Sequence, residues 1–159
     1  MRKPYCPTDF GYGRPAELAV MRRLSRCGIS VTWAATAADP YGPDVTMCWG
    51  HDSTERFVEV ERRRTGWQSG DWPWPTIHIP ARRVEKPNLA ETALAVVRAD
   101  CGMALVIRGR ILAAVAERCT RQTLPVIGDA GYVIPSALAA GAFNLAGIEC
   151  PFTGVANDI

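Results

Sequence analysis

Long apolar runs are missing from this sequence. No stretch reaches the roughly 18 apolar residues that a membrane-spanning helix needs, and residues 1–6 lack the apolar core of a secretory signal. The chain has 159 residues, 48% of them hydrophobic and 21% charged, which is the balance of one globular domain able to bury a core. We therefore expect a soluble, cytoplasmic protein with a single domain over residues 1–159 and no membrane partner.

The usual motifs of several chemistries are also missing. The six cysteines form no Cys-x-x-Cys pair and no histidine completes a zinc set, so neither a zinc site nor a disulfide framework is expected. The sequence contains no Gly-x-x-x-x-Gly-Lys-[Ser/Thr] loop, no Gly-x-Gly-x-x-Gly fingerprint and no Gly-x-Ser-x-Gly elbow. Nucleotide hydrolysis, dinucleotide redox chemistry and serine-based hydrolysis thus lack their usual supports.

Lysine is scarce. Only Lys3 and Lys86 are lysines among 18 basic residues, and the formal net charge is +2. This arginine bias has two readings, a GC-rich genome or phosphate recognition by planar guanidinium groups. Composition alone does not choose between them.

The first half of the chain predicts a helix followed by a three-strand meander. The helix starts at Arg14, with Pro15 in its first turn, and stops at Gly28. The β-branched and aromatic residues that follow, separated by turns rich in glycine and proline, predict strands at 29–35, 44–49 and 56–62.

The second half predicts shorter elements. Residues 65–75 form a loop whose tryptophans either pack on the sheet or stack on bases, and 77–79 form a strand that leads into a helical turn ending before Pro87. Strands 93–99 and 103–107 are expected to form a hairpin. Residues 111–117 fit a strand or a helix, and a strand at 131–135 precedes a small-residue helix or coil.

Three carboxylates are expected to converge in the meander. Glu59 and Glu61 share one face of their strand, since side chains alternate, and antiparallel pairing would bring Asp44 beside them. Carboxylate oxygens suit a hard divalent ion such as Mg²⁺. The alternative is a solvated strand face whose acids form surface ion pairs with residues 62–64.

The order of these motifs resembles the αβββ core of PD-(D/E)xK nucleases, including small phage or prophage proteins of that class. The resemblance implies an α+β fold with a restriction-endonuclease-like αβββαβ core, a mixed central sheet flanked by helices. Asp44, after Pro43, would match the metal-binding aspartate, and Glu59 the second acid. Glu61 occupies the position usually held by lysine, and Glu17 matches the acid of the first helix.

The resemblance further implies a Mg²⁺- or Mn²⁺-dependent endonuclease that hydrolyses DNA, with RNA as the less favoured alternative. Asp44, Glu59 and Glu61 would be metal ligands, with Glu61 alternatively a general base and Glu17 orienting a water. Lys86 would supply the missing ammonium group. The expected nucleic-acid contacts are Arg62, Arg63, Arg82, Arg83 and Lys86. A homodimer stays open, as does the alternative of an inactive nuclease-fold protein that binds nucleic acid or a protein.

Overall fold

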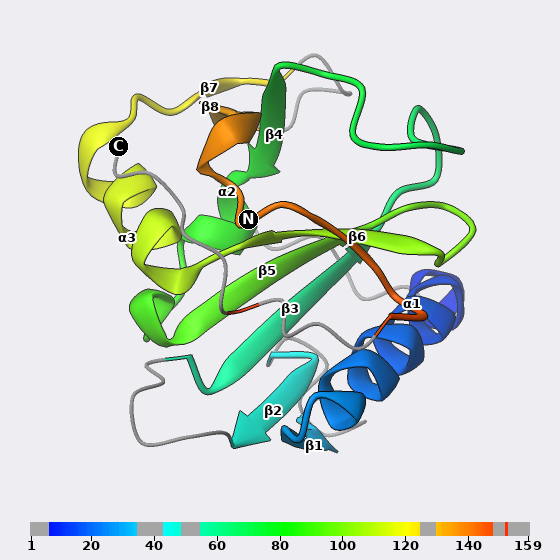
Figure 1. The fold of residues 1–159 in the computed structure, drawn as a ribbon. Helices are drawn as coiled ribbons and strands as arrows, with labels where there is room; N and C mark the ends of the chain where they lie inside the picture. The colour runs from blue at the N-terminus through cyan, green and yellow to red at the C-terminus, as the bar shows by residue number, and fades with distance from the viewer. Residues whose placement is uncertain (1–6, 35–42, 49–54, 125–129, 148–151, 153–159) are drawn as a thin grey trace.

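The computed structural model describes residues 7–34, 43–48, 55–124, 130–147 and 152. Its helices and strands form an α+β structure in which a large mixed sheet separates two packed layers (Figure 1). None of the helices in this described part is long and apolar enough to cross a membrane.

The large sheet has six strands in the order β1-β2-β3-β5-β6-β9. Its strands are β1 (Ser30–Trp33), β2 (Val45–Cys48), β3 (Phe57–Arg62), β5 (Thr92–Val97), β6 (Met103–Ile107) and β9 (Ala142–Asn144). Neighbouring strands are antiparallel except β3 and β5, which run parallel. A second sheet has the order β4-β8-β7, formed by β4 (Thr76–Pro80), β8 (Ala130–Pro135) and β7 (Gln122–Thr123).

The predicted helix and meander are present. Helix α1 (Pro7–Arg26) begins earlier than expected, so that Pro15 lies inside it, and it ends before Gly28, whose positive φ of 85° suits glycine. Strands β1, β2 and β3 follow as an antiparallel meander. Its turns, 35–42 and 49–54, lie outside the described residues.

The connection from β3 to β5 crosses over one face of the large sheet. It contains β4, the four-residue helix α2 (Ala81–Val84) and the 3₁₀ turn η1 (Leu89–Glu91). A crossover of this kind is needed because two parallel strands cannot be joined by a tight turn. The predicted hairpin of β5 and β6 is confirmed.

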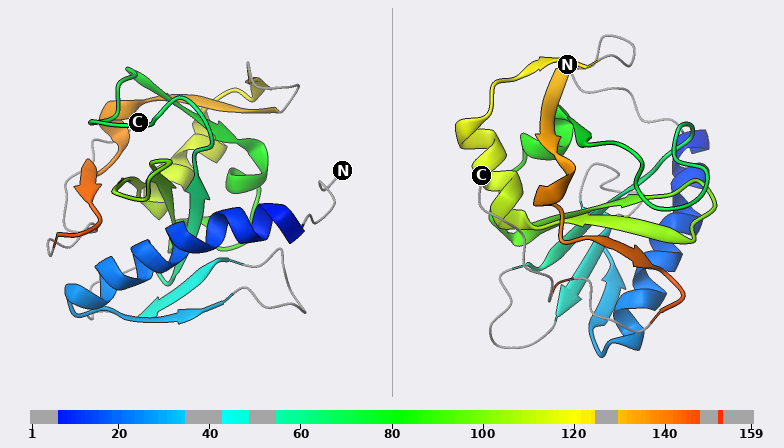
Figure 2. Two further views of the ribbon diagram at one scale, coloured as in Figure 1. Left: turned by 90° about the vertical axis from the view of Figure 1, so that its right-hand side faces the viewer. Right: turned by 45° about the horizontal axis from the view of Figure 1, so that its top comes forward.

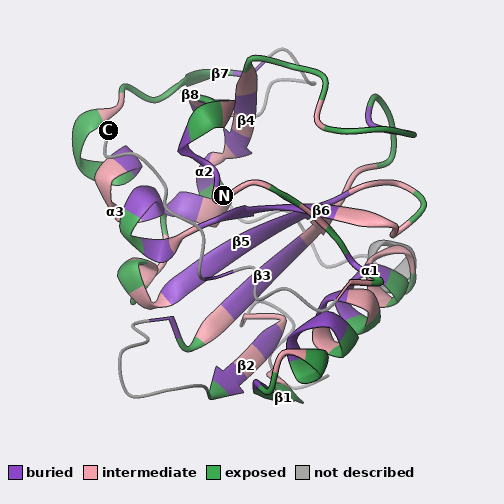
Figure 3. Cartoon of the chain, viewed as in Figure 1, coloured by how far each residue is buried: buried purple, intermediate pink, exposed green. Residues whose placement is uncertain are grey.

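Two hydrophobic cores lie on opposite faces of the large sheet (Figures 2 and 3). On one face α1 packs Ala16, Val20 and Leu24 against the sheet. On the other face the second sheet, α2 and α3 (Gly109–Arg118) enclose a core that includes the fully buried Trp67. Trp67 therefore packs the 65–75 loop, whereas Trp74 is 40% exposed.

Long-range pairing accounts for what the local pattern did not predict. Residues 111–117 are helical within α3, and the segment after β8 forms the 3₁₀ turn η2 (Ser136–Leu138) and then β9 at the sheet edge, rather than a helix or coil. The second sheet pairs β4 with β8, which lie more than 50 residues apart. No local periodicity reveals such a partner.

Gly109, the first residue of α3, packs against the backbone of η1. A Cβ there would collide with the backbone carbonyl oxygen of Ala90, and a backbone atom cannot move aside cheaply. We expect Gly109→Ala to lower the free energy of unfolding by about 2 kcal/mol, measured by urea denaturation. The matched control is Gly11→Ala in α1, where a Cβ meets nothing within 4 Å, and it should be neutral or stabilising. Equal stability of the two variants would contradict this close approach.

Candidate functional site

Strand β3 presents two acids on the face opposite α1. In the β3–β5 register Glu59 lies beside Leu94 and Glu61 beside Val96, and both of these apolar residues belong to the core on the α2 and α3 side. Val58 and Val60 point to the α1 side. The predicted division of the strand is therefore confirmed. Glu59 is only 1% exposed, so its carboxylate depends on protein groups for compensation of its charge.

Asp44 joins these acids through the β2–β3 pairing. Val45 pairs with Val58, which puts Asp44, at the start of β2, across from Glu59. The Val60 N–H donates to Asp44 Oδ2 at 2.6 Å. Burial, and then the nearby charge of Glu59, raise the pKa of Asp44 to about 7, against the lowering effects of Arg83 and the Val60 N–H. We call Asp44, Glu59 and Glu61 the acid cluster.

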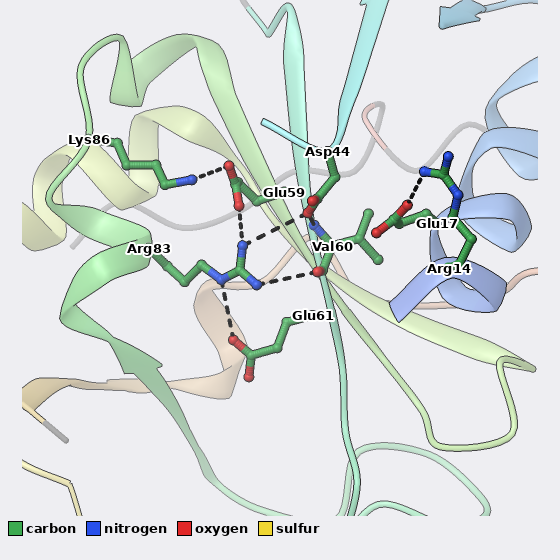
Figure 4. A network of polar contacts seen from close by, with 8 residues as sticks. All are labelled: Arg14, Glu17, Asp44, Glu59, Val60, Glu61, Arg83 and Lys86. Atoms are coloured by element: carbon green, nitrogen blue, oxygen red, sulfur yellow. Dashed lines mark hydrogen bonds and ion pairs between the residues drawn. The ribbon is translucent and has the colours of Figure 1, made fainter. Parts of the chain in front are cut away.

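The guanidinium of Arg83 lies in the middle of the acid cluster (Figure 4). Its Nη1 donates to Glu59 Oε2 and lies 3.9 Å from Asp44 Oδ2, while its Nε lies 3.7 Å from Glu61 Oε2. Its Nη2 donates to the Val60 carbonyl oxygen at 3.4 Å. Burial lowers the pKa of Arg83, but the charges of Glu59, Glu61 and Asp44 outweigh burial and raise it.

Lys86 approaches Glu59 from the other side. Its Nζ donates to Glu59 Oε1, so the two oxygens of this buried carboxylate are bound by two different cations. Both cations come from α2 or the residues just after it, because Pro80 ends β4 and the chain turns into the helix above the acids. Ala81 and Val84 anchor that helix in the core.

Two further arginines bind the acids at the ends of this arrangement. Arg63 Nη1 lies 3.2 Å from Glu61 Oε1, and Arg14 Nη1 lies 2.9 Å from Glu17 Oε2 on α1. Glu17 is buried and its charge contributes to the raised pKa of Asp44. Glu17 therefore lies near the acid cluster, held on α1 by its own arginine.

The arginines expected to bind nucleic acid divide into two groups. Arg62 turns into the protein, where it donates to the carbonyl oxygens of Ala99 and Tyr12 and lies over the Tyr12 ring. Arg63 and Arg83 bind the acids described above. Arg82, on the outer side of α2, is exposed. Of these four arginines, Arg82 is the one whose position most readily suits an external phosphate.

A buried ion pair outside the acid cluster, Glu55 with Arg108, is not predicted by the sequence pattern. Glu55 accepts from Arg108 Nε at 2.6 Å and from the Gly109 N–H at the start of α3. Burial raises the pKa of Glu55, but the hydrogen bonds and charge of Arg108 outweigh it, so the pKa lies below its usual range. Glu55 lies just before β3 and thus ties this strand to the start of α3. No local sequence motif connects residues 53 positions apart.

The side chains as they stand do not form a ready-made metal site. Within the described ranges, no three Asp, Glu, His or Cys side chains come together as a ligand set. The physical reason is Arg83, whose guanidinium separates Glu61 from Glu59 and Asp44 (Figure 4).

Comparisons of the chain with protein-family models, curated proteins and solved structures found no match.

Asp44 gives the site a testable pH dependence. Its pKa is raised from 3.8 to about 7 on folding, so the folded chain holds the proton more tightly. The resulting stabilisation is complete below pH 4 and is lost as the pH rises through about 7. Asp44→Asn keeps an acceptor for the Val60 N–H. The difference in unfolding free energy between this variant and wild type should therefore shift in favour of the variant by roughly 2–4 kcal/mol as the pH rises from 4 to 8. Urea denaturation with a chelator present measures this difference.

Asp100→Asn provides the control with the opposite sign. The side-chain hydrogen bond from Arg98 lowers the pKa of Asp100, so this variant should lose stability relative to wild type above pH 4. If Asp44→Asn shows no gain with rising pH, the carboxyl of Asp44 is not held in the buried, acid-rich environment described here.

Proposed function

We propose that this protein is a metal-dependent nuclease of the PD-(D/E)xK type in which Lys86 replaces the lysine missing from β3. The observation that carries the proposal is the contact of Lys86 Nζ with Glu59, whose carboxylate lies across from Asp44. Lys86 and Asp44 thus both lie beside Glu59, although the lysine comes from a different element. Glu61 at the usual lysine position is then compatible with activity.

The order of elements supports the proposal. Helix α1, the antiparallel meander β1-β2-β3, the crossover with α2 and the parallel strand β5 follow the αβββαβ order of that nuclease core. Asp44 directly precedes the second strand of the meander and Glu59 lies on the third. The second sheet is an addition within the crossover and after α3.

Oxygen atoms near Arg83 would be the ligands of a divalent ion once the guanidinium has moved. Asp44 and Glu59 offer carboxylates, and the Val60 carbonyl oxygen faces the same guanidinium. Such hard oxygen donors suit Mg²⁺ or Mn²⁺. Burial and the charge of Glu59 raise the pKa of Asp44, so a nearby divalent ion would favour its ionised form. We therefore propose Asp44, Glu59 and the Val60 carbonyl as ligands.

Hydrolysis of a phosphodiester requires a positioned water and positive charge where the transition state becomes more negative. A divalent ion at Asp44 and Glu59 would acidify water and neutralise phosphate charge. Lys86 would keep its ammonium at Glu59, directed toward the same phosphate, and Arg82 would contact the neighbouring backbone of the DNA. Glu17 would act through the field that it exerts at Asp44.

The second candidate is a nuclease-fold protein without catalysis that binds nucleic acid or a protein. It is favoured by one observation, the occupation of both Glu59 oxygens by Arg83 and Lys86. In that case the charges would serve the fold rather than a reaction, and the exposed Arg82 and Trp74 would contribute to a binding surface.

A cleavage assay separates the two candidates. With Mg²⁺ or Mn²⁺ the purified protein should cleave DNA, and Asp44→Asn, Glu59→Gln and Lys86→Met should each reduce the rate by about 100-fold or more, because each removes a ligand or charge needed in the transition state. The measurement is single-turnover cleavage of labelled single- and double-stranded DNA, with RNA as a comparison.

Glu85→Gln is the matched control for Glu59→Gln. Glu85 also forms an ion pair, with Arg121 at 2.8 Å, but both partners are about half exposed, at 46% and 54%. Such surface pairs contribute little, so this variant should keep full activity. A folded wild-type protein that binds DNA but does not cleave it with either metal would favour the second candidate.

A further inference from the structure

We propose that Arg83 is a displaceable counter-ion, which occupies the cation position of the acid cluster in the metal-free protein and moves toward Glu61 when a divalent ion binds. This inference rests on the proposed function, since it takes Asp44 and Glu59 as residues that hold the ion. It assigns to Arg83 and Glu61 a role different from phosphate contact and metal ligation.

The guanidinium of Arg83 lies where the proposed ion would bind. Arg83 contacts Glu59 Oε2, Asp44 Oδ2 and the Val60 carbonyl oxygen, the same three groups that would surround a divalent ion. A guanidinium and a divalent ion cannot both occupy that place, because their charges repel strongly at a separation of a few ångströms in a buried setting. Binding of the ion therefore requires the guanidinium to leave.

The hydrogen bonding of Arg83 is incomplete in this position. Among the residues that the structure describes, the buried Nε of Arg83 has no hydrogen-bond acceptor and the buried Oε2 of Glu61 has no donor. The distances of Arg83 from Asp44 and Glu61, 3.9 and 3.7 Å, are too long for hydrogen bonds. A buried polar group left unpaired in this way is destabilising. The guanidinium is thus held here by charge, with incomplete hydrogen bonding.

Glu61 is close enough to bind the guanidinium of Arg83 after it moves. Glu61 Oε2 lies 3.7 Å from Arg83 Nε, so a small side-chain movement would pair these two unsatisfied atoms. Arginine and carboxylate groups can then form two parallel hydrogen bonds. The helix itself need not move, because the buried residues Ala81 and Val84 anchor α2. This gives the glutamate at position 61 a use that a lysine could not fulfil.

Lys86, unlike Arg83, need not move when the ion binds. It binds Oε1 of Glu59, the oxygen that does not contact Arg83. It can keep this contact while Oε2 changes from the guanidinium to the ion. The two cations of the α2 segment thus have separate roles, one that stays and one that moves.

The test is direct measurement of Mn²⁺ binding by calorimetry, without substrate. Arg83→Gln removes the competing charge and should bind Mn²⁺ about ten-fold more tightly than wild type. Arg82→Gln is the matched control, since it makes the same charge change on the exposed side of α2, and its affinity should stay within about two-fold of wild type. Equal gains in both variants, or weaker binding by Arg83→Gln, would overturn the proposal.

A double-mutant cycle tests the role of Glu61. If Glu61 receives the guanidinium, Glu61→Gln should weaken Mn²⁺ binding in the wild-type background and have little effect together with Arg83→Gln. An equal loss in both backgrounds would show that Glu61 is itself a ligand and would overturn its assigned role.

A measurement on the unsubstituted protein covers the case in which Arg83→Gln does not fold. The Nε–H resonance of Arg83, identified by its loss in Arg83→Lys, should shift as Mg²⁺ is added, and an unchanged resonance at saturation would overturn the proposal. If wild type, Arg83→Gln and Arg82→Gln all bind no Mn²⁺, the proposed nuclease function fails, an outcome distinct from equal binding by all three.

Discussion

The burial of the Glu59 carboxylate is the constraint on which the site depends. Glu59 lies on a sheet face whose neighbouring strand contributes Leu94 and Val96 to a hydrophobic core, and it is almost fully inaccessible to solvent. An ionised carboxylate is costly in such a place unless cations and hydrogen bonds compensate it. Arg83 and Lys86 meet this requirement, one on each oxygen. The crossover between β3 and β5 therefore has to bring positive charge over the sheet.

Around this carboxylate the charges alternate in space. Lys86, Glu59, Arg83, Glu61 and Arg63 follow one another as contacts of opposite sign. A purely structural ion pair would be well served by fewer groups with better hydrogen bonds. Among the described residues, the unpaired atoms of Arg83 and Glu61 instead mark an arrangement whose hydrogen bonding is incomplete.

Glu55 and Arg108 show the contrasting case within the same fold. There one buried acid has one arginine at hydrogen-bonding distance and a backbone N–H in addition, and its pKa is lowered. That pair ties β3 to α3. The comparison separates a buried acid with one arginine and a backbone N–H from the acid cluster, where Arg83 lies near three carboxylates.

The sequence by itself determined the local features. Proline, glycine and the alternation of β-branched residues predicted α1, the meander and the β5–β6 hairpin, and the period of two in β3 put Glu59 and Glu61 on one face. Antiparallel pairing then predicted that Asp44 lies nearby, because register in a meander follows from short connections.

Only the tertiary structure decided which cations meet these acids. Residues 24 and 27 positions beyond Glu59 reach it because β4 leaves the large sheet to pair with β8, and α2 starts where that strand ends. The turning inward of Arg62 and the separation of Glu61 from the other two acids follow from the same packing. Neither periodicity nor composition encodes these contacts, since they depend on pairing between distant segments. The sequence thus supplied the acids, and the fold selected their partners.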